Sequence, residues 1–188
     1  MAFDALADAV RGARFRADLT VREIPAPGGL APEAVALAAN VRDESLHDDS
    51  PYGAGRFILL HDPSEPAGWD GPLRIVTFAG APLETEIGAD PLLTDVAWAW
   101  LIDALESRGA AFHASAGTAT KTVSKGFGSL ASQGEGAQIE LRASWSPSAA
   151  EHIVDHVEAW AELVCMLAGL PPGSEDAPMI AAQRWSRD

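Results

Sequence analysis

The stretch RFILLHDPSEPAGWDGPLRIVTFAG, residues 56–80, decides the fold class of this chain. It contains two compact apolar runs, 56–62 and 73–80, each of strand length. A turn-rich connection, residues 63–72, joins them. The pattern predicts two neighbouring strands that pair as an antiparallel hairpin with a wide loop.

Outward from this hairpin, the sequence predicts more strands and three helices. Residues 15–24 and 110–125 are typical of extended chain, and residues 137–145 alternate apolar and polar side chains as a half-buried strand does. Residues 33–42 fit either a strand or an alanine-rich helix, and we favour the strand. Helical spacing of apolar residues occurs in 2–13, between Asp90 and Gly109, and between Ser146 and Gly169.

Consecutive strands, rather than strict alternation of strand and helix, predict an α+β fold. We expect a two-layer sandwich, with a mainly antiparallel sheet of about five strands and the helices on one face. With 188 residues the chain fits one domain. We place that domain at residues 1–172 and predict a flexible C-terminal tail at 173–188.

Composition excludes several classes of function. The net charge of −14 argues against nucleic acid and against an anionic membrane surface as partners. No apolar run reaches the ~20 residues of a membrane span. Cys165 is the only cysteine, which excludes an internal disulfide and a multi-cysteine zinc site. The N-terminus does not have the pattern of a secretory signal, so a cytoplasmic location is expected.

The distribution of charge along the chain is uneven. Residues 75–107 and 143–183 contain no Lys or Arg and six acidic residues each, and they hold the two strongest helical patterns. Most cations fall in extended segments. This segregation predicts an acidic helical layer on one face of the sheet and a cationic surface on the other. The candidate binding face consists of Arg42, Arg74, Lys121 and Arg142, with Trp69 of the connecting loop as a further contact residue.

Such a mixed apolar and cationic face suits an acidic protein segment or a small carboxylate ligand. The alternative is that these cations pair with nearby acids such as Glu140. Homodimerisation through an uncovered sheet face or an edge strand is a further possibility.

No motif predicts catalysis or a cofactor. His152 and His156 have the helical spacing of metal ligands, but Ile153 stands where a metalloprotease has its glutamate. We interpret the pair as part of a solvated polar helix face. His61 and Asp62 are interpreted as the end of a strand. No nucleophile elbow accompanies them. We therefore expect neither a metal nor a cofactor, and we lean against an enzyme.

Four segments, residues 55–84, 90–112, 137–147 and 156–172, resemble a bacterial family known as domain of unknown function 3000. The elements WDG (69–71), DPLL (90–93) and ELRASW (140–145) carry the resemblance and occur in this order. The element order is also similar to that of the type III secretion chaperone and YbjN-like fold. From the mixed apolar and cationic sheet face we predict a non-enzymatic binding or adaptor module, chaperone-like in kind. A small hydrolase or lyase with an unrecognised pocket is the alternative.

Overall fold

The computed structural model describes residues 2–42, 50–170 and 172, so the predicted tail at 173–188 lies outside the described residues. A six-stranded sheet with the order β1-β2-β3-β4-β6-β5 forms the centre, and every neighbouring pair is antiparallel. The strands are β1 (Leu19–Ile24), β2 (Glu33–Val41), β3 (Ala54–His61), β4 (Leu73–Leu83), β5 (Phe112–Lys125) and β6 (Glu135–Pro147).

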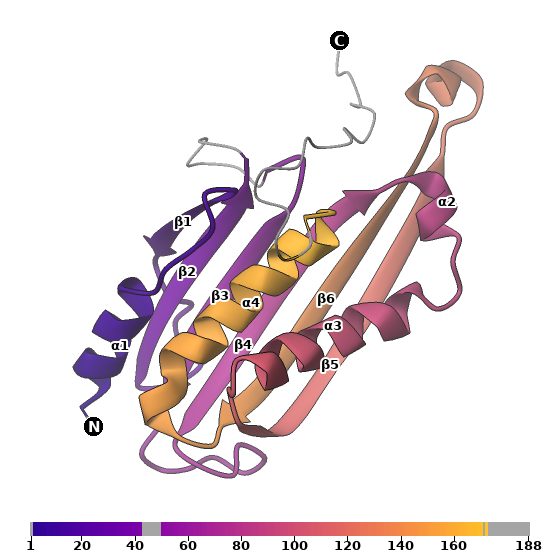
Figure 1. Cartoon of the computed structure of the whole chain (residues 1–188). Coiled ribbons are helices and arrows are strands. Elements are labelled where there is room, and N and C mark those ends of the chain that lie inside the picture. The colour runs from indigo at the N-terminus through magenta and orange to yellow at the C-terminus, as the bar shows by residue number, and fades with distance from the viewer. Residues whose placement is uncertain (1, 43–49, 171, 173–188) are drawn as a thin grey trace.

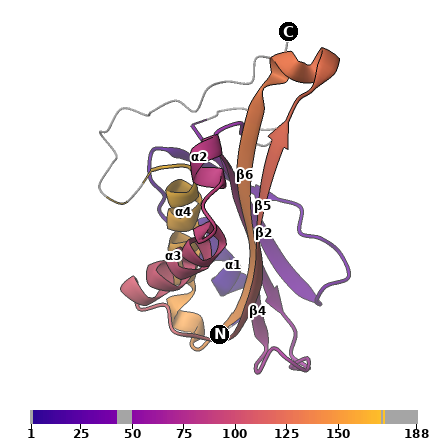
Figure 2. The same ribbon diagram turned by 90° about the vertical axis from the view of Figure 1, so that its right-hand side faces the viewer.

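The helices pack on one face of this sheet, as the two views in Figure 1 and Figure 2 show. The α-helices are α1 (Phe3–Arg11), α2 (Thr85–Gly88), α3 (Leu93–Ser107) and α4 (Ile153–Leu167), and short 3-10 turns η1 (Gly128–Gln133) and η2 (Ala150–His152) complete the described elements. The predicted two-layer α+β sandwich with helices on one face is therefore confirmed.

The strand count differs slightly from the prediction, since the sheet has six strands rather than about five. Residues 33–41 form β2, which pairs with β1 on one side and β3 on the other. Small alanine side chains allow this segment to be buried within the sheet, which settles the choice between strand and helix.

Helix α4 is the centre of the core. Trp160 is fully buried, with its ring centroid 5.6 Å from that of Phe57, and its Nε1 donates to the carbonyl of Phe78 at 3.1 Å. Gly55 lies beneath it on β3. A Cβ at this position would come within 2.5 Å of Val164 and 2.9 Å of Trp160. The absence of a side chain at residue 55 thus allows α4 to lie directly on the sheet.

The interpretation of His152 and His156 as one solvated face is wrong for His156. His156 is 0% exposed, and its Nδ1 accepts a hydrogen bond from Trp145 Nε1 at 3.1 Å. Helix α4 packs against the sheet and also against α1 and α3, so little of its circumference reaches solvent. His152 remains exposed and pairs with Asp155 at 3.1 Å.

Replacing Gly55 with alanine is expected to destabilise the fold by about 1–3 kcal/mol, because the new methyl group overlaps Val164 and Trp160. Urea unfolding of Gly55→Ala measures this loss. Gly28→Ala is the matched control, since no atom lies within 4 Å of a Cβ at residue 28. Equal stability of both variants would contradict the close contact between α4 and β3.

Protonation of His156 is expected to destabilise the fold in acid. Burial is the largest cause that lowers the pKa of His156, to about 4, with Asp155 raising it and His152 lowering it more weakly. The unfolded chain takes up this proton near pH 6.5. The contribution of neutral His156 is therefore complete above pH 6.5 and is lost as the pH falls towards 4, by about 3 kcal/mol in all.

The measurement is the free energy of unfolding of the unmodified protein and of His156→Gln between pH 7 and pH 4. Glutamine keeps an acceptor for Trp145 and does not titrate. The difference in the free energy of unfolding between the two proteins should narrow as the pH falls. A constant difference would contradict the low pKa of His156.

Candidate functional site

The face of the sheet opposite the helices carries the residues that alternate with the core positions. Phe57 and Gly55 point to the helices, so their neighbours Arg56 and Ile58 point to the other side. Within the described ranges 2–42, 50–170 and 172, no helix covers this open face (Figure 2).

Register places three arginines in one row that crosses all six strands. Cross-strand neighbours follow in the order Arg22, Ala38, Arg56, Phe78, Arg142 and Thr118. The arginine row (Arg22, Arg56 and Arg142) thus occupies every second strand, with Cα spacings of about 9.5 Å. A parallel apolar row lies beside it, made of the half-exposed or small residues Ile24, Ala36, Ile58 and Val76.

Arg142 is the most exposed of the three arginines in the row. Its guanidinium lies 5.3 Å from the centroid of the Phe78 ring, and its Nη2 pairs with Glu140 at 3.3 Å. The Arg142 side chain is nonetheless 67% exposed. An exposed ion pair to a strand neighbour is weak, and the stacked guanidinium keeps donors for another carboxylate.

The other two arginines have different surroundings. Arg56 Nη1 donates to the carbonyl of Gly55 at 2.9 Å. Among the described residues, no carboxylate lies within ion-pair distance of Arg22, which is half-buried on the short edge strand β1. Glu140 is the one acidic side chain that the described strands place on this face, so these strands carry more basic than acidic groups there.

Arg74, a predicted site residue, lies on the same face but is engaged within the protein. Its guanidinium donates to Ser144 at 2.7 Å, to the carbonyl of Ala114 at 2.8 Å and to Ser146 at 3.3 Å. Burial lowers the pKa of Arg74, and the side chain has no charged partner among the described residues. Arg74 therefore acts mainly as a structural clamp between β4, β5 and β6.

Trp69, the predicted contact residue of the loop, is fixed next to this clamp through its backbone. Ser146 Oγ donates to the carbonyl of Trp69 at 2.5 Å, and a ring nitrogen of His113 lies 2.9 Å from the carbonyl of Asp70. The β3–β4 loop is thus attached to the end of β6. Trp69 is half-buried there and lies away from the arginine row.

The structure does not bring Arg42 and Lys121 to the open face. Lys121 lies opposite Ile139, on the helix side, and its Nζ donates to the carbonyl of Asp90 at 2.7 Å. The alternation of β5 sends Thr118 and Thr120, not Lys121, to the open face. Arg42 follows the end of β2 with φ of 47° and pairs with Asp18 at 3.1 Å. The expectation of one common face for all four cations is therefore wrong.

The sequence interpretation missed Arg22 and Arg56 as members of the face. The signal was present in the alternation, because Arg22 stands between Val21 and Glu23 on the helix side and Arg56 precedes the core residue Phe57. What the sequence could not supply was the register that aligns residues 22, 56 and 142 across strands far apart in the chain.

A shallow hollow of about 240 Å³ adjoins the arginine row. Phe78, Gly80 and Glu140 of the open face line it together with Ala54 and Gln138. Glu140 is its one ionisable lining residue among those described. The hollow therefore offers surface for contact but no pair of groups for acid–base chemistry.

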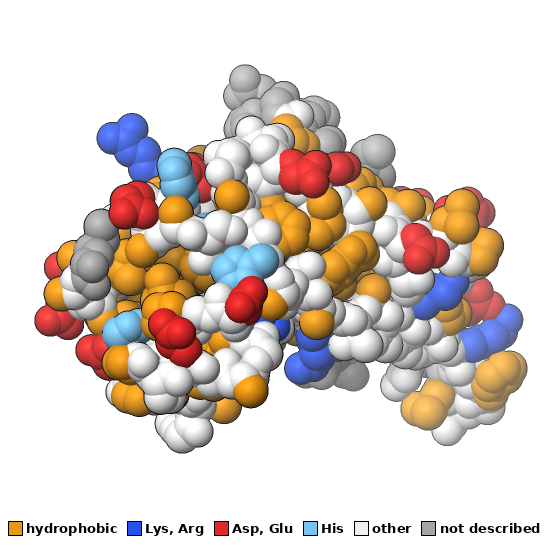
Figure 3. Space-filling model, turned by 90° about the horizontal axis from the view of Figure 1, so that it is seen from below, with side chains coloured by type: hydrophobic (Ala, Val, Ile, Leu, Met, Phe, Trp, Pro, Cys, Tyr) orange, Lys and Arg blue, Asp and Glu red, His pale blue; other side chains and the backbone are white. Residues whose placement is uncertain are grey.

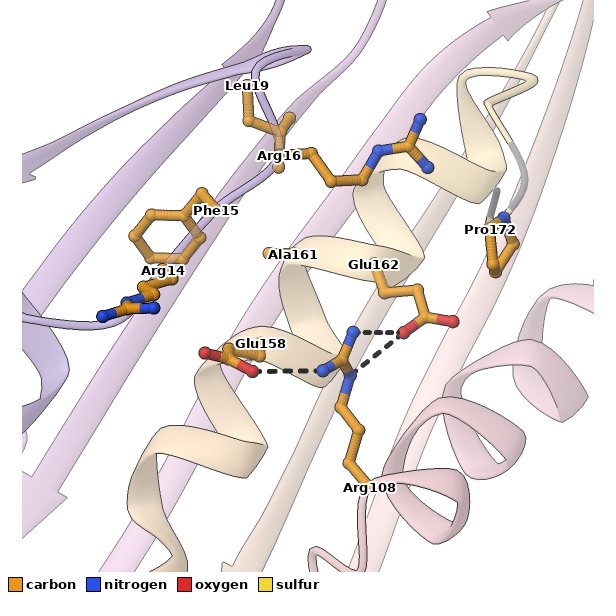
Figure 4. A pocket seen from close by; sticks show the side chains of 9 residues that line it. All are labelled: Arg14, Phe15, Arg16, Leu19, Arg108, Glu158, Ala161, Glu162 and Pro172. Atoms are coloured by element: carbon orange, nitrogen blue, oxygen red, sulfur yellow. Dashed lines mark hydrogen bonds and ion pairs between the residues drawn. The ribbon is translucent and has the colours of Figure 1, made fainter. Parts of the chain in front are cut away.

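A second hollow, of about 120 Å³, lies on the helix side between α4 and the segment before β1 (Figure 4). Arg108 fills one wall, with Nη1 3.1 Å from Glu158 and Nη2 2.6 Å from Glu162. Arg16 on the opposite wall pairs with Asp18 at 2.7 Å. These two arginines tie the end of α3 and the start of β1 to their surroundings, and Arg14 is the third arginine that lines the hollow.

The remaining histidines do not assemble a metal site. In the described part of the chain, no group of three or more His, Cys, Asp or Glu side chains could hold a metal ion. His61 stacks on Phe3 and pairs with Glu33 at 2.5 Å. Asp62 accepts two hydrogen bonds from Ser64, which lower the pKa of its carboxyl group. These contacts fix the side chains at the end of β3.

Fold and site together define a class of protein: a two-layer α+β sandwich whose sheet face opposite the described helices carries a row of arginines. The chain belongs to the family described as Protein of unknown function (DUF3000), whose model matches residues 1–176. Searches of curated proteins and of solved structures found no significant match. The likeness to the type III secretion chaperone and YbjN-like fold therefore stays a hypothesis. None of the helices in the described residues is long and apolar enough to cross a bilayer.

The different surroundings of Arg74 and Arg142 predict different effects of mutation. Arg74→Met is expected to lower the free energy of unfolding by about 1–3 kcal/mol, because Ser144, Ser146 and Ala114 lose a charged donor. Arg142→Met is expected to change it by less than about 0.5 kcal/mol. Urea denaturation of both variants checks this difference, and equal effects would show that Arg74 is not a clamp.

Proposed function

We propose that the protein is a non-enzymatic binding module that holds an acidic segment of another protein on the open face of its sheet. The arginine row is the observation that carries this proposal. It runs across all six strands and is flanked by an apolar row, so a ligand there meets guanidinium groups and hydrophobic side chains together. Protein interfaces combine these two components, and arginine is enriched in them.

Length favours a protein segment over a small carboxylate ligand. The row spans six strands, whereas the adjoining hollow has a volume of only about 240 Å³. Carboxylates spaced about 10 Å apart would match every second strand. A polyproline II segment with an acid at every third residue provides about 9.3 Å, and a helix with acids seven residues apart about 10.5 Å.

The charge of the whole chain adds selectivity. At −14 overall, the molecule repels other acidic molecules over most of its surface. The described strands place four arginines, including the internally bonded Arg74, and one glutamate on this face, which is a local exception. An acidic partner would therefore be oriented towards this face during encounter, which acts on the association rate and on specificity.

The enzyme alternative has weaker support. A small hydrolase or lyase needs titratable groups that converge in a cleft. In the described residues, the hollow on the open face has Glu140 alone as an ionisable lining group, and the buried His156 faces Trp145 in the core. These observations favour contact rather than catalysis.

The test uses a fluorescein-labelled deca-glutamate peptide as the probe and fluorescence anisotropy as the readout. The double variant Arg22→Glu/Arg142→Glu is expected to weaken binding about tenfold or more, because each charge reversal replaces attraction with repulsion. Its melting temperature should stay within about 2 °C of the unmodified value, since both side chains are outside the core.

Arg14→Glu is the control for the single reversal Arg142→Glu, with the same change in net charge on the helix side of the sheet. It should weaken binding much less than Arg142→Glu. Equal loss in both variants would reduce the effect to overall charge and overturn the proposal. Absence of saturable binding to the unmodified protein at low ionic strength would also overturn it.

A further inference from the structure

The second surface open to a partner is the outer edge of β5. The sheet ends at β1 and β5. Strand β1 has six residues, and helix α1 reaches it through the pair Arg11–Glu23. Strand β5 has 14 residues, and after an irregularity between His113 and Ala116 its remainder, 116–125, pairs with β6 in unbroken register.

No described segment pairs with the outer edge of β5. Its end and the start of β6 form the β5–β6 arm (residues 121–139), which packs against α2 at its base and projects past α2 at its tip in Figure 1 and Figure 2. A long, straight edge strand presents backbone N–H and C=O groups that a further strand can satisfy. Short or covered edges avoid this, and β1 is such an edge, whereas β5 is long and no described segment covers its outer edge.

The side chains of β5 indicate which kind of strand could pair with its outer edge. Residues 107–134 contain no Asp or Glu, in a chain whose net charge is −14. Lys121, Val123 and Lys125 lie at alternate positions on the helix side, opposite Ile139, Ala137 and Glu135 of β6. Val123 is 55% exposed. The other side of the strand presents only hydroxyl groups, from Thr118, Thr120, Thr122 and Ser124.

Both lysines keep capacity for a ligand. Lys121 uses one donor on the carbonyl of Asp90, and Lys125 pairs with the exposed Glu135. An ammonium group has three donors, so each lysine can also bind a carboxylate from an added strand. Figure 3 views the molecule from the end opposite to the tip of the arm, and basic side chains lie next to hydrophobic ones at the distant right-hand side.

We propose that β5 binds an extended segment of another protein by strand addition, with the pattern acidic–x–apolar–x–acidic. The two acids lie opposite Lys121 and Lys125, and the apolar residue lies opposite Val123, as cross-strand pairs. Because the pattern reads the same in both directions, it fits a parallel or an antiparallel strand. A second copy of this chain is a poor occupant, because lysine-bearing edges disfavour pairing with each other.

This proposal is independent of the arginine row, which lies on the open face. The probe is a fluorescein-labelled peptide of sequence TETVTET with blocked ends, measured by fluorescence anisotropy. We expect saturable binding by the unmodified protein, retained by Arg22→Glu/Arg142→Glu. We expect Lys121→Gln/Lys125→Gln to weaken binding about two- to thirtyfold, the range for two exposed ion pairs. Lys121→Arg/Lys125→Arg should restore it.

Two N-methylated peptides distinguish strand addition from simple charge attraction. One carries methyl groups on the backbone nitrogens of both glutamates and the valine, and the other on those of the two inner threonines. In an added strand only one of these sets faces β5. One peptide should therefore bind within about threefold of the parent, and the other should lose binding at least tenfold.

Four outcomes would overturn the proposal. The first is the absence of saturable binding to TETVTET. The second is equal binding of the two methylated peptides, which would leave charge alone as the cause. The third is a dimer of the protein, seen by analytical ultracentrifugation, whose formation excludes the peptide from β5. The fourth is loss of peptide binding in Arg22→Glu/Arg142→Glu, which would instead assign this peptide to the open face.

Discussion

The contact between helix α4 and strand β3 is the constraint on which the rest of the architecture depends. Gly55 leaves the space into which Val164 and Trp160 fit, and Trp160 is fixed further by its hydrogen bond to the carbonyl of Phe78. With α4 seated there, α1 and α3 pack on its two sides and the helical layer closes over one face of the sheet. Most of the large apolar residues of the strands then lie on that face, and the residues that alternate with them face outward.

This division explains why the outward residues are of the types found there. A surface that no described helix covers carries fewer large apolar side chains than the core face, because exposed apolar area favours association. Strand β2 accordingly presents alanines, β5 presents threonines, and β1, β3 and β6 present the arginines. The helical layer needs few cations, and one of them, Arg108, joins α3 to two glutamates of α4.

The sequence predicted the layers better than the site. The hairpin of residues 56–80 and the alternation in 137–145 were sufficient for an antiparallel α+β sandwich, because both are local patterns. The charge segregation indicated a cationic face. Which residues lie on that face depends on the alternation of side chains along each strand and on the register between strands. Thus Lys121, assigned there, lies on the helix side, whereas Arg22 and Arg56 were missed. His156 was misjudged because its burial comes from α1, α3 and the sheet, and helical spacing shows only one element.

The two proposed surfaces would recognise acidic partners by different physics. On the open face, arginines lie at the spacing of alternate strands, and their planar guanidinium groups can stack and bind carboxylates at once, as Arg142 does with Phe78 and Glu140. At the edge of β5, backbone groups would supply the attraction, while Lys121 and Lys125 would select the sequence and oppose self-pairing. Because the row runs across the strands and the edge runs along them, one partner segment cannot follow both directions. A partner that engages both surfaces must therefore use two segments, and each can be removed without disturbing the other.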